Sequence, residues 1–265
     1  MSSRLAVVTG ATGKIGAAIA RSLSAIDGYD VLLLVRNEIA GTRLAEALSR
    51  VGKTKVRCAV VDLSLHASIA SFAVGFREPV HVLVNNAAIA PRRRAVTREG
   101  IEMVFATNVL GYFWLSTALE GNLHGAGEAR VVDVASYWAG DLKLDDLEFQ
   151  RRPYDNDTAY RQSKQANRML SVALAERYRD RRITVNSCHP GDVNSRLSND
   201  LGFGGSTSAD DAARTPFWLA TAPELSGVTG KYFADCREQR CAFAADREAI
   251  ARLVAECERR TPPRA

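Results

Sequence analysis

Short runs of apolar residues alternate with helix-period segments along nearly the whole chain. Runs rich in Val, Leu and Ile predict strands at residues 5–9, 31–35, 56–61, 80–84, 130–135, 183–188 and 228–233. Helical periodicity predicts helices near 14–25, 38–50, 66–76, 101–119, 158–179, 208–221 and 246–259. Apolar strands separated by helices are typical of a parallel sheet covered on both faces. The pattern therefore predicts an α/β fold, a single doubly wound domain over residues 1–265 with about seven strands.

Three irregular segments follow predicted strands, at residues 86–98, 139–157 and 190–208. The carboxyl ends of parallel strands meet at one edge of a sheet, and ligands bind there in doubly wound folds. Glycines at 202, 204 and 205 give the third segment hinge freedom. We therefore expect a substrate lid at about 192–208.

Composition and charge exclude several classes of protein. The net charge of +5 comes mostly from scattered arginine clusters without interleaved aromatic residues, which argues against a nucleic-acid surface. No secretory leader or membrane span is recognisable, so we expect a cytoplasmic protein. The five cysteines are dispersed; only Cys236 and Cys241 are close, and no histidine stands near these two at metal-ligand spacing. We interpret them as reduced thiols, with no disulfide framework and no metal site.

A glycine-rich turn directly follows the first predicted strand. Glycines at 10, 13 and 16 allow a tight turn and close approach of the backbone to a pyrophosphate, and a helix opens immediately afterwards. The free N–H groups and the dipole of that helix favour phosphate. The turn predicts a dinucleotide site that includes Gly10, Thr12, Gly13, Lys14, Ile15 and Gly16.

Tyr160 and Lys164 stand four residues apart on a predicted helix, so both side chains lie on one face. An isolated phenol has a pKa near ~10, and a nearby cation favours its ionised form. Ser136, which closes an apolar strand, can hold the oxygen that gains or loses the proton. This set suits reversible carbonyl–alcohol chemistry, and because no side chain supplies hydride, it requires a nicotinamide cofactor.

Two cations predict that this cofactor is NADP(H) rather than NAD(H). An NAD enzyme usually carries an acid at the end of the second strand, and this chain has Arg36 there instead. A guanidinium can bind the extra phosphate with two hydrogen bonds. Lys14, in the glycine turn, is a candidate second cation for that phosphate.

Several ordered motifs together resemble the short-chain dehydrogenase/reductase family, a family of Rossmann-fold enzymes. They are Thr9–Gly16, Asp62-Leu63, Asn85-Asn86-Ala87-Ala88, Thr107-Asn108-Val109, Ser136, Tyr160–Lys164 and His189-Pro190-Gly191. Asp145-Asp146-Leu147 and residues 230–236 are similar to the retinol-dehydrogenase-like branch.

The resemblance implies further roles. Tyr160 is the catalytic acid/base, Lys164 lowers its pKa and binds the nicotinamide ribose, and Asn108 holds a water that connects Lys164 to solvent. Asp62 and Leu63 meet the adenine, and Asn86 and Ala87 lie along the adenosine ribose. The nicotinamide is flanked by Pro190, Gly191 and Val193.

Two features depart from the compact members of the family. The glycine spacing is typical of longer sugar-nucleotide epimerase/dehydratase relatives, although the chain leaves little room for their substrate domain. Ser136 and Tyr160 are 24 residues apart, which indicates an inserted loop at about 140–157. In compact relatives the Tyr–Lys helix packs against its copy, so an insert beside it predicts a monomer or dimer rather than a tetramer. A non-catalytic nucleotide-sensing protein on the same fold is a further alternative.

The aromatic residues near the expected site favour a hydrophobic aldehyde or ketone. Tyr137 and Trp138 follow Ser136, and Leu197, Leu201 and Phe203 lie in the lid. We expect Ser136, Tyr137, Trp138, Tyr160 and Phe203 to contact the substrate. Arg92–Arg94 leave open an acidic substrate instead, because they follow the fourth strand.

Overall fold

The chain forms one Rossmann-like α/β domain in the computed structural model, which describes residues 3–263. Its eight-stranded sheet has the order β3-β2-β1-β4-β5-β6-β7-β8. The strands are β1 (Arg4–Thr9), β2 (Tyr29–Val35), β3 (Val56–Val60), β4 (Val82–Asn85), β5 (Ala129–Val134), β6 (Ile183–His189), β7 (Tyr232–Ala234) and β8 (Arg237–Gln239). The first seven are parallel and β8 is antiparallel to β7. The predicted fold class is confirmed, with one short edge strand added.

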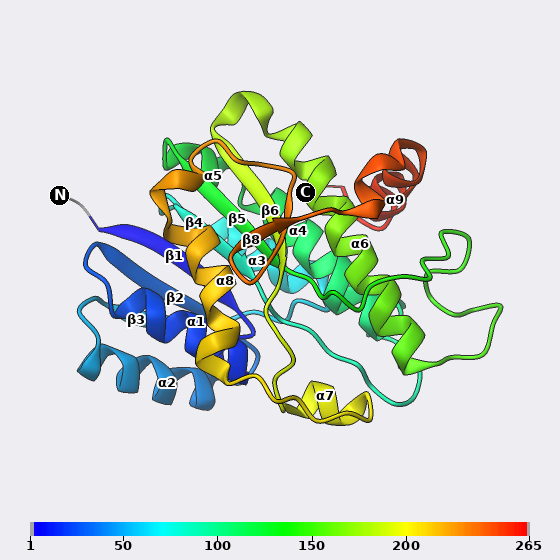
Figure 1. The fold of residues 1–265 in the computed structure, drawn as a ribbon, viewed down its shortest axis with the longest axis horizontal. Helices are drawn as coiled ribbons and strands as arrows, with labels where there is room; N and C mark the ends of the chain where they lie inside the picture. The colour runs from blue at the N-terminus through cyan, green and yellow to red at the C-terminus, as the bar shows by residue number, and fades with distance from the viewer. Residues whose placement is uncertain (1–2, 264–265) are drawn as a thin grey trace.

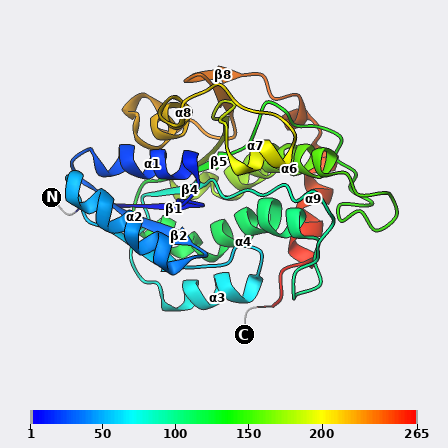
Figure 2. The ribbon, with the colours of Figure 1, turned by 90° about the horizontal axis from the view of Figure 1, so that it is seen from below.

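Helices cover both faces of this sheet (Figures 1 and 2). They are α1 (Lys14–Ser24), α2 (Glu38–Val51), α3 (His66–Gly75), α4 (Gly111–Ala118), α5 (Glu120–Gly125), α6 (Asn156–Arg177), α7 (Arg196–Asp200), α8 (Ala209–Thr221) and α9 (Arg247–Arg259). Short helical turns add η1 (Phe105–Leu110), η2 (Arg179–Arg181), η3 (Pro223–Leu225) and η4 (Ala242–Ala245). α1, α2 and α8 pack on one face, and α3, α4 and α6 pack on the other, with α9 against α6.

The alternation of side chains along β1 shows why the sheet is buried on both faces. Leu5 and Val7 enter the core under α4 and α6, whereas Ala6 and Val8 enter the core under α1 and α8. All four are at most 5% exposed. Burial of apolar area on both faces is the main stabilising contribution, roughly 25 cal/mol per Å².

Two predicted elements differ from the structure. The strand expected at 228–233 is only β7, because Gly227 and Gly230 have positive φ and turn the chain before it. The helix expected at 101–119 starts later and contains a π-helical segment, η1. Its start is delayed because Glu102 pairs with Val96 in an isolated bridge. The Glu102 carboxylate then caps the N–H groups of Val104 and Phe105, at 2.9 and 2.7 Å.

The strand order places the candidate site. β1 lies between β2 and β4, so the direction of winding reverses there and leaves a crevice beyond the strand ends. α7, drawn in yellow in Figure 1, belongs to the segment that closes this crevice. Among residues 3–263 no helix is both long and apolar enough to span a membrane.

Candidate active site

The turn after β1 has no room for a side chain at Gly10 or at Gly16. Gly10 has a φ of +62°, and a Cβ there would lie 2.7 Å from the Cα of Ala87. A Cβ at Gly16 would lie 2.4 Å from the carbonyl oxygen of Gly10. Gly13 donates its N–H to that same carbonyl at 3.0 Å, which closes the turn. The turn therefore brings bare backbone to the wall of the cavity.

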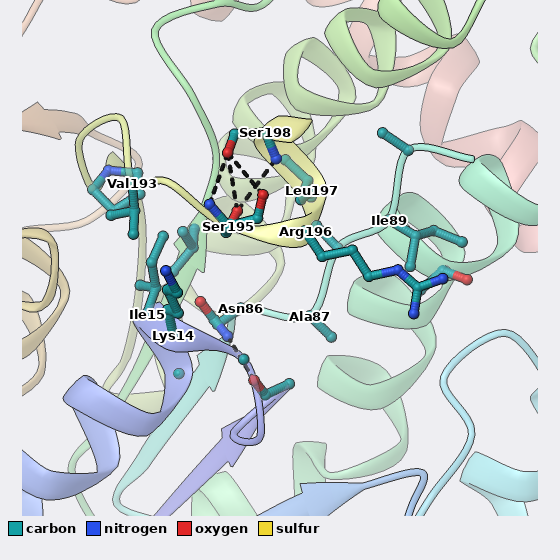
Figure 3. Close-up of a pocket in the computed structure, with 18 of the residues that line it drawn as sticks. Lys14, Ile15, Asn86, Ala87, Ile89, Val193, Ser195, Arg196, Leu197 and Ser198 are labelled. Carbon is teal, nitrogen blue, oxygen red and sulfur yellow. Dashed lines mark hydrogen bonds between the residues drawn. The ribbon is translucent and has the colours of Figure 1, made fainter. Parts of the chain in front are cut away.

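The N-terminus of α1 opens into that cavity. Its N-cap is Gly13, which has no side chain to cap the helix, and its first turn holds no acidic residue. Thr12, Lys14 and Ile15 line the cavity with the two flanking glycines (Figure 3). An uncapped helix N-terminus favours an anion through its N–H groups and its dipole. This end of the cavity suits a pyrophosphate.

Asn86, at the end of β4, holds the glycine turn in place. Its Nδ2 donates to the carbonyls of Thr9 and Gly10, at 2.9 and 3.3 Å. The hydroxyl of Thr9 in turn accepts the N–H groups of Asn86 and Ala87, at 2.8 and 3.1 Å. Asn86 and Ala87 both line the cavity, as predicted, and Asn86 has this structural duty as well.

Lys14 and Arg36 bring two positive charges to the lining of the cavity. Both side chains line it and both residues are exposed. Neither forms an ion pair or a side-chain hydrogen bond with another residue of the described chain. Two cations without a protein partner suit a ligand that carries an additional phosphate.

Asp62 is not placed where its predicted role requires. Its carboxylate accepts the N–H and the hydroxyl of Ser64, at 2.9 and 2.7 Å, so it caps the turn before α3. Val61 and Leu63 line the cavity, but Asp62 does not. An Asp at a strand end is drawn to nearby backbone donors, and that local preference prevails here.

Ser136, Tyr160 and Lys164 meet in the cavity, as predicted, and all three are nearly buried, at 5%, 8% and 1% exposure. Ser136 follows β5, while α6 carries the other two residues on one face. Asp155 starts α6 by accepting the Thr158 N–H at 2.7 Å. The Lys164 Nζ donates to the Val134 carbonyl at 2.8 Å and lies 5.6 Å from the centre of the Tyr160 ring.

Burial controls the pKa values of this pair. Burial raises the pKa of Tyr160 to about 12, and a hydrogen bond with Ser136 opposes the shift. Burial lowers the pKa of Lys164 to about 7, and the negative charge of Asp133 opposes this shift by raising the pKa. Lys164 is not among the groups that shift the Tyr160 pKa in this structure, so its role in lowering that pKa stays a prediction. Tyr160 is thus a protonated phenol at neutral pH.

Asn108 lies in η1 and does not line the cavity. Its side chain exchanges hydrogen bonds with the backbone of Ile89, at 2.9 and 3.0 Å, and donates to Ser163 at 3.1 Å. Its carbonyl accepts the Nδ2 of Asn167 at 2.7 Å. Asn108 therefore joins the segment after β4 to α6, and its water-holding role stays a prediction.

The segment after β6 forms another wall of the cavity. Pro190, Gly191 and Val193 all line it, together with His189, and their place beside the nicotinamide stays a prediction. Gly191 has a φ of +110°, and a Cβ there would lie 2.8 Å from Thr207. This wall therefore needs glycine at position 191.

An aromatic pair stands at the other end of the cavity. The Trp138 and Phe203 rings meet edge to face with centres 5.4 Å apart, and both line the cavity, as does Leu197. Tyr137 does not line the cavity: it is 58% exposed and packs against His189, so its predicted contact with the substrate stays a prediction. Successive residues after a strand point in opposite directions, so only one of the two neighbouring aromatics reaches the cavity.

The segment at 192–208 lies across the cavity from the glycine turn and Asn86 (Figure 3). Val193 and Thr207 form a bridge that joins its two ends. Ser195 and Ser198 form a capping box that starts α7, which the sequence pattern did not reveal. Gly205 is not a free hinge, because a Cβ there would lie 2.1 Å from the Asp192 carbonyl.

The arginines at 92–94 do not line the cavity. Arg92 donates to the Asn199 carbonyl at 3.1 Å, and Arg94 donates to the Glu148 carbonyl at 2.9 Å. Arg92 thus ties the segment after β4 to α7. These contacts remove the reason to expect an acidic substrate from this cluster.

The cavity has a volume of about 790 Å³, within the usual range for a ligand site. Ile89, Met103 and Asp192 also line the cavity, and the sequence analysis assigned none of them a role. They belong to no motif, and only the folded chain brings them to the site.

The chain belongs to the short-chain dehydrogenase/reductase family. The family model for short chain dehydrogenases matches residues 4–202, which include the glycine turn, Ser136, Tyr160 and Lys164. Membership makes the protein an oxidoreductase of that family.

Named relatives agree with this assignment. A "Probable oxidoreductase" of Streptomyces antibioticus is 37% identical, over 91% of this chain and 87% of its own. Retinol dehydrogenase 13 of Mus musculus is 31% identical, over 94% of this chain and 80% of its own. A metagenomic short-chain oxidoreductase, solved in complex with NADP, matches with a TM-score of 0.67 and 25% identity, over 88% of this chain and 96% of its own.

Proposed function

We propose that this protein is an NADP(H)-dependent oxidoreductase that interconverts a carbonyl compound and an alcohol, with Tyr160 as the acid/base. One observation carries the proposal: Ser136, Tyr160 and Lys164 line the same cavity as the glycine turn of α1. A proton donor and a dinucleotide-binding backbone thus share one enclosed space.

The cavity fits a nicotinamide dinucleotide. Gly10, Gly13 and Gly16 line the cavity with backbone that carries no side chain, and the α1 N-terminus offers N–H groups to the pyrophosphate. Lys14 and Arg36 would hold the additional phosphate of NADP(H), and Lys164 would hold the nicotinamide ribose. When bound, the cofactor supplies or accepts the hydride.

The protein side of the reaction is a proton transfer. Because burial raises the Tyr160 pKa to about 12, this phenol is protonated at neutral pH and donates its proton to the carbonyl oxygen during reduction. The Ser136 hydroxyl holds the same oxygen. In the direction of alcohol oxidation the phenol must first lose its proton, which a cationic Lys164 would favour.

The substrate end of the cavity favours an apolar carbonyl compound. Trp138 and Phe203 form one wall, and Leu197, Ile89 and Met103 also line the cavity. Similarity to a protein named retinol dehydrogenase 13 supports an apolar substrate class. A site of aromatic and aliphatic side chains favours such a compound by removing its apolar surface from water.

The test is turnover of NADPH by the purified protein against retinal, aliphatic and aromatic aldehydes, steroids, quinones and small anionic ketoacids. We expect the highest kcat/KM with an apolar carbonyl compound. A best substrate that is small and anionic would contradict the apolar assignment. NADPH binding without turnover of any carbonyl would instead support a nucleotide-sensing protein.

Localisation is a separate proposal. We propose a cytoplasmic protein, and fractionation of the producing cells tests it: recovery in the membrane fraction after a high-salt wash would contradict it.

A further inference from the structure

Two cationic side chains of α6 hold two alternate carbonyl groups where β5 ends, those of its last residue Val134 and of Ser136. The Lys164 Nζ donates to the Val134 carbonyl at 2.8 Å. Arg168, one helical turn later, donates from its guanidinium to the carbonyl of Ser136. Lys164 and Arg168 are four residues apart and share one face of α6, so both cations reach the chain where β5 ends.

Arg168 is held firmly in this position. It is 7% exposed, and its guanidinium carbon lies 3.5 Å from the centre of the Tyr232 ring and 5.7 Å from that of Phe243. A flat guanidinium stacked on an aromatic ring has little freedom to turn, so its hydrogen bond to the Ser136 carbonyl has a fixed direction.

The rest of the loop fixes Ser136 less well. The next residue, Tyr137, is 58% exposed, and the Ser136 hydroxyl accepts the Trp138 N–H at 3.1 Å. A fixed carbonyl orients the peptide plane of Ser136 and therefore the direction of its side chain. Without that contact the hydroxyl that faces Tyr160 would lose its defined position.

We infer that Arg168 is a positioning residue, which sets the Ser136 hydroxyl for the reaction by clamping the Ser136 carbonyl. The inference rests on the proposed function. It assigns Arg168 a duty different from that of Lys164, because Arg168 does not line the cavity and touches neither substrate nor cofactor. A merely structural Arg168 would affect stability, with no special dependence on Ser136.

A double-mutant cycle separates these two roles. Arg168→Met keeps the bulk of the side chain and removes the hydrogen bond, and it should lower kcat by ~10- to 100-fold, because small misplacements in a site have effects of that size. The NADPH dissociation constant should stay within a factor of about two. In a Ser136→Ala background the same change should lower kcat by less than about threefold, since no hydroxyl remains to be positioned.

Two further variants serve as controls, one at the ring beneath the guanidinium and one that keeps a cation at position 168. Tyr232→Phe preserves the ring under the guanidinium and should leave kcat unchanged, because the Tyr232 hydroxyl has no partner in the described chain. Arg168→Lys retains a cation that can reach the carbonyl and should recover part of the lost kcat. If Arg168→Met does not fold, the cycle is run with Arg168→Lys, whose smaller loss of kcat should likewise disappear in the Ser136→Ala background.

The outcomes are distinct. Equal losses of kcat from the Arg168 change with and without Ser136 would overturn the inference, as would a normal kcat in Arg168→Met. A normal kcat in Ser136→Ala would overturn the proposed function itself.

Discussion

At the scale of single residues, Lys164 has a charge that changes near neutral pH. Burial lowers its pKa to about 7 from an ordinary value of 10.5. The cation therefore predominates below that pH and is lost above it. If the cation holds the ribose, the affinity for NADPH falls as pH rises from about 7 to 9, by up to roughly tenfold per pH unit.

Fluorescence titration with NADPH across this pH range checks the prediction. Lys164→Met should bind more weakly and show a flat profile, whereas Lys14→Met should keep the slope. A wild-type affinity that does not change with pH would show that Lys164 does not bind the cofactor as a cation.

Arg36 is the residue on which cofactor preference depends most directly. It lines the cavity and has no ion-pair partner in the described chain. Arg36→Asp should weaken NADPH binding by roughly 10- to 100-fold, the range of a charged hydrogen bond, and spare NADH. Dissociation constants for both cofactors measure the effect, and equal wild-type affinities for the two would refute it.

At the scale of elements, the segment 192–208 contributes one aromatic to the substrate end. Phe203→Ala removes the edge-to-face contact with Trp138 and part of the apolar wall. It should lower kcat/KM for apolar carbonyl compounds by ~5- to 20-fold, mainly through KM. Leu201→Ala is the matched control, because Leu201 lies in the same segment but does not line the cavity. Similar losses in the two variants would mean that the segment acts only through its folding.

The same elements show what sequence patterns reveal and what they miss. Strands, helices and the positions of Tyr160 and Lys164 follow from local periodicity, which neighbouring residues determine. Asp62 and Tyr137 lie outside the cavity lining, because the direction of a loop side chain depends on contacts such as Asp62 with Ser64 and Tyr137 with His189, which sequence patterns do not reveal. The short helix α7 and the π-helical η1 depend on side-chain caps and tertiary packing, which leave little periodic signal.

At the scale of the whole molecule, the surface of α6 is covered within the chain. α9 packs against α6, and the segment at 140–157 contacts its first turns through Leu147 with Gln162 and Asp141 with Arg161, both at 2.8 Å. A covered helix has little area left for a copy of itself. We therefore predict a monomer or dimer, and light scattering at micromolar concentration checks it; a tetramer would contradict the prediction.

The central claim is that Tyr160 donates a proton to the oxygen of a carbonyl compound. The compound lies in the same cavity as the cofactor, which the glycine turn binds. Its most direct test is Tyr160→Phe, with turnover of the best carbonyl substrate and NADPH affinity measured on the same preparation. The account predicts that kcat falls by ~10²-fold or more, because the phenol proton is lost, while the dissociation constant of NADPH changes little. Near-normal turnover in Tyr160→Phe would contradict it.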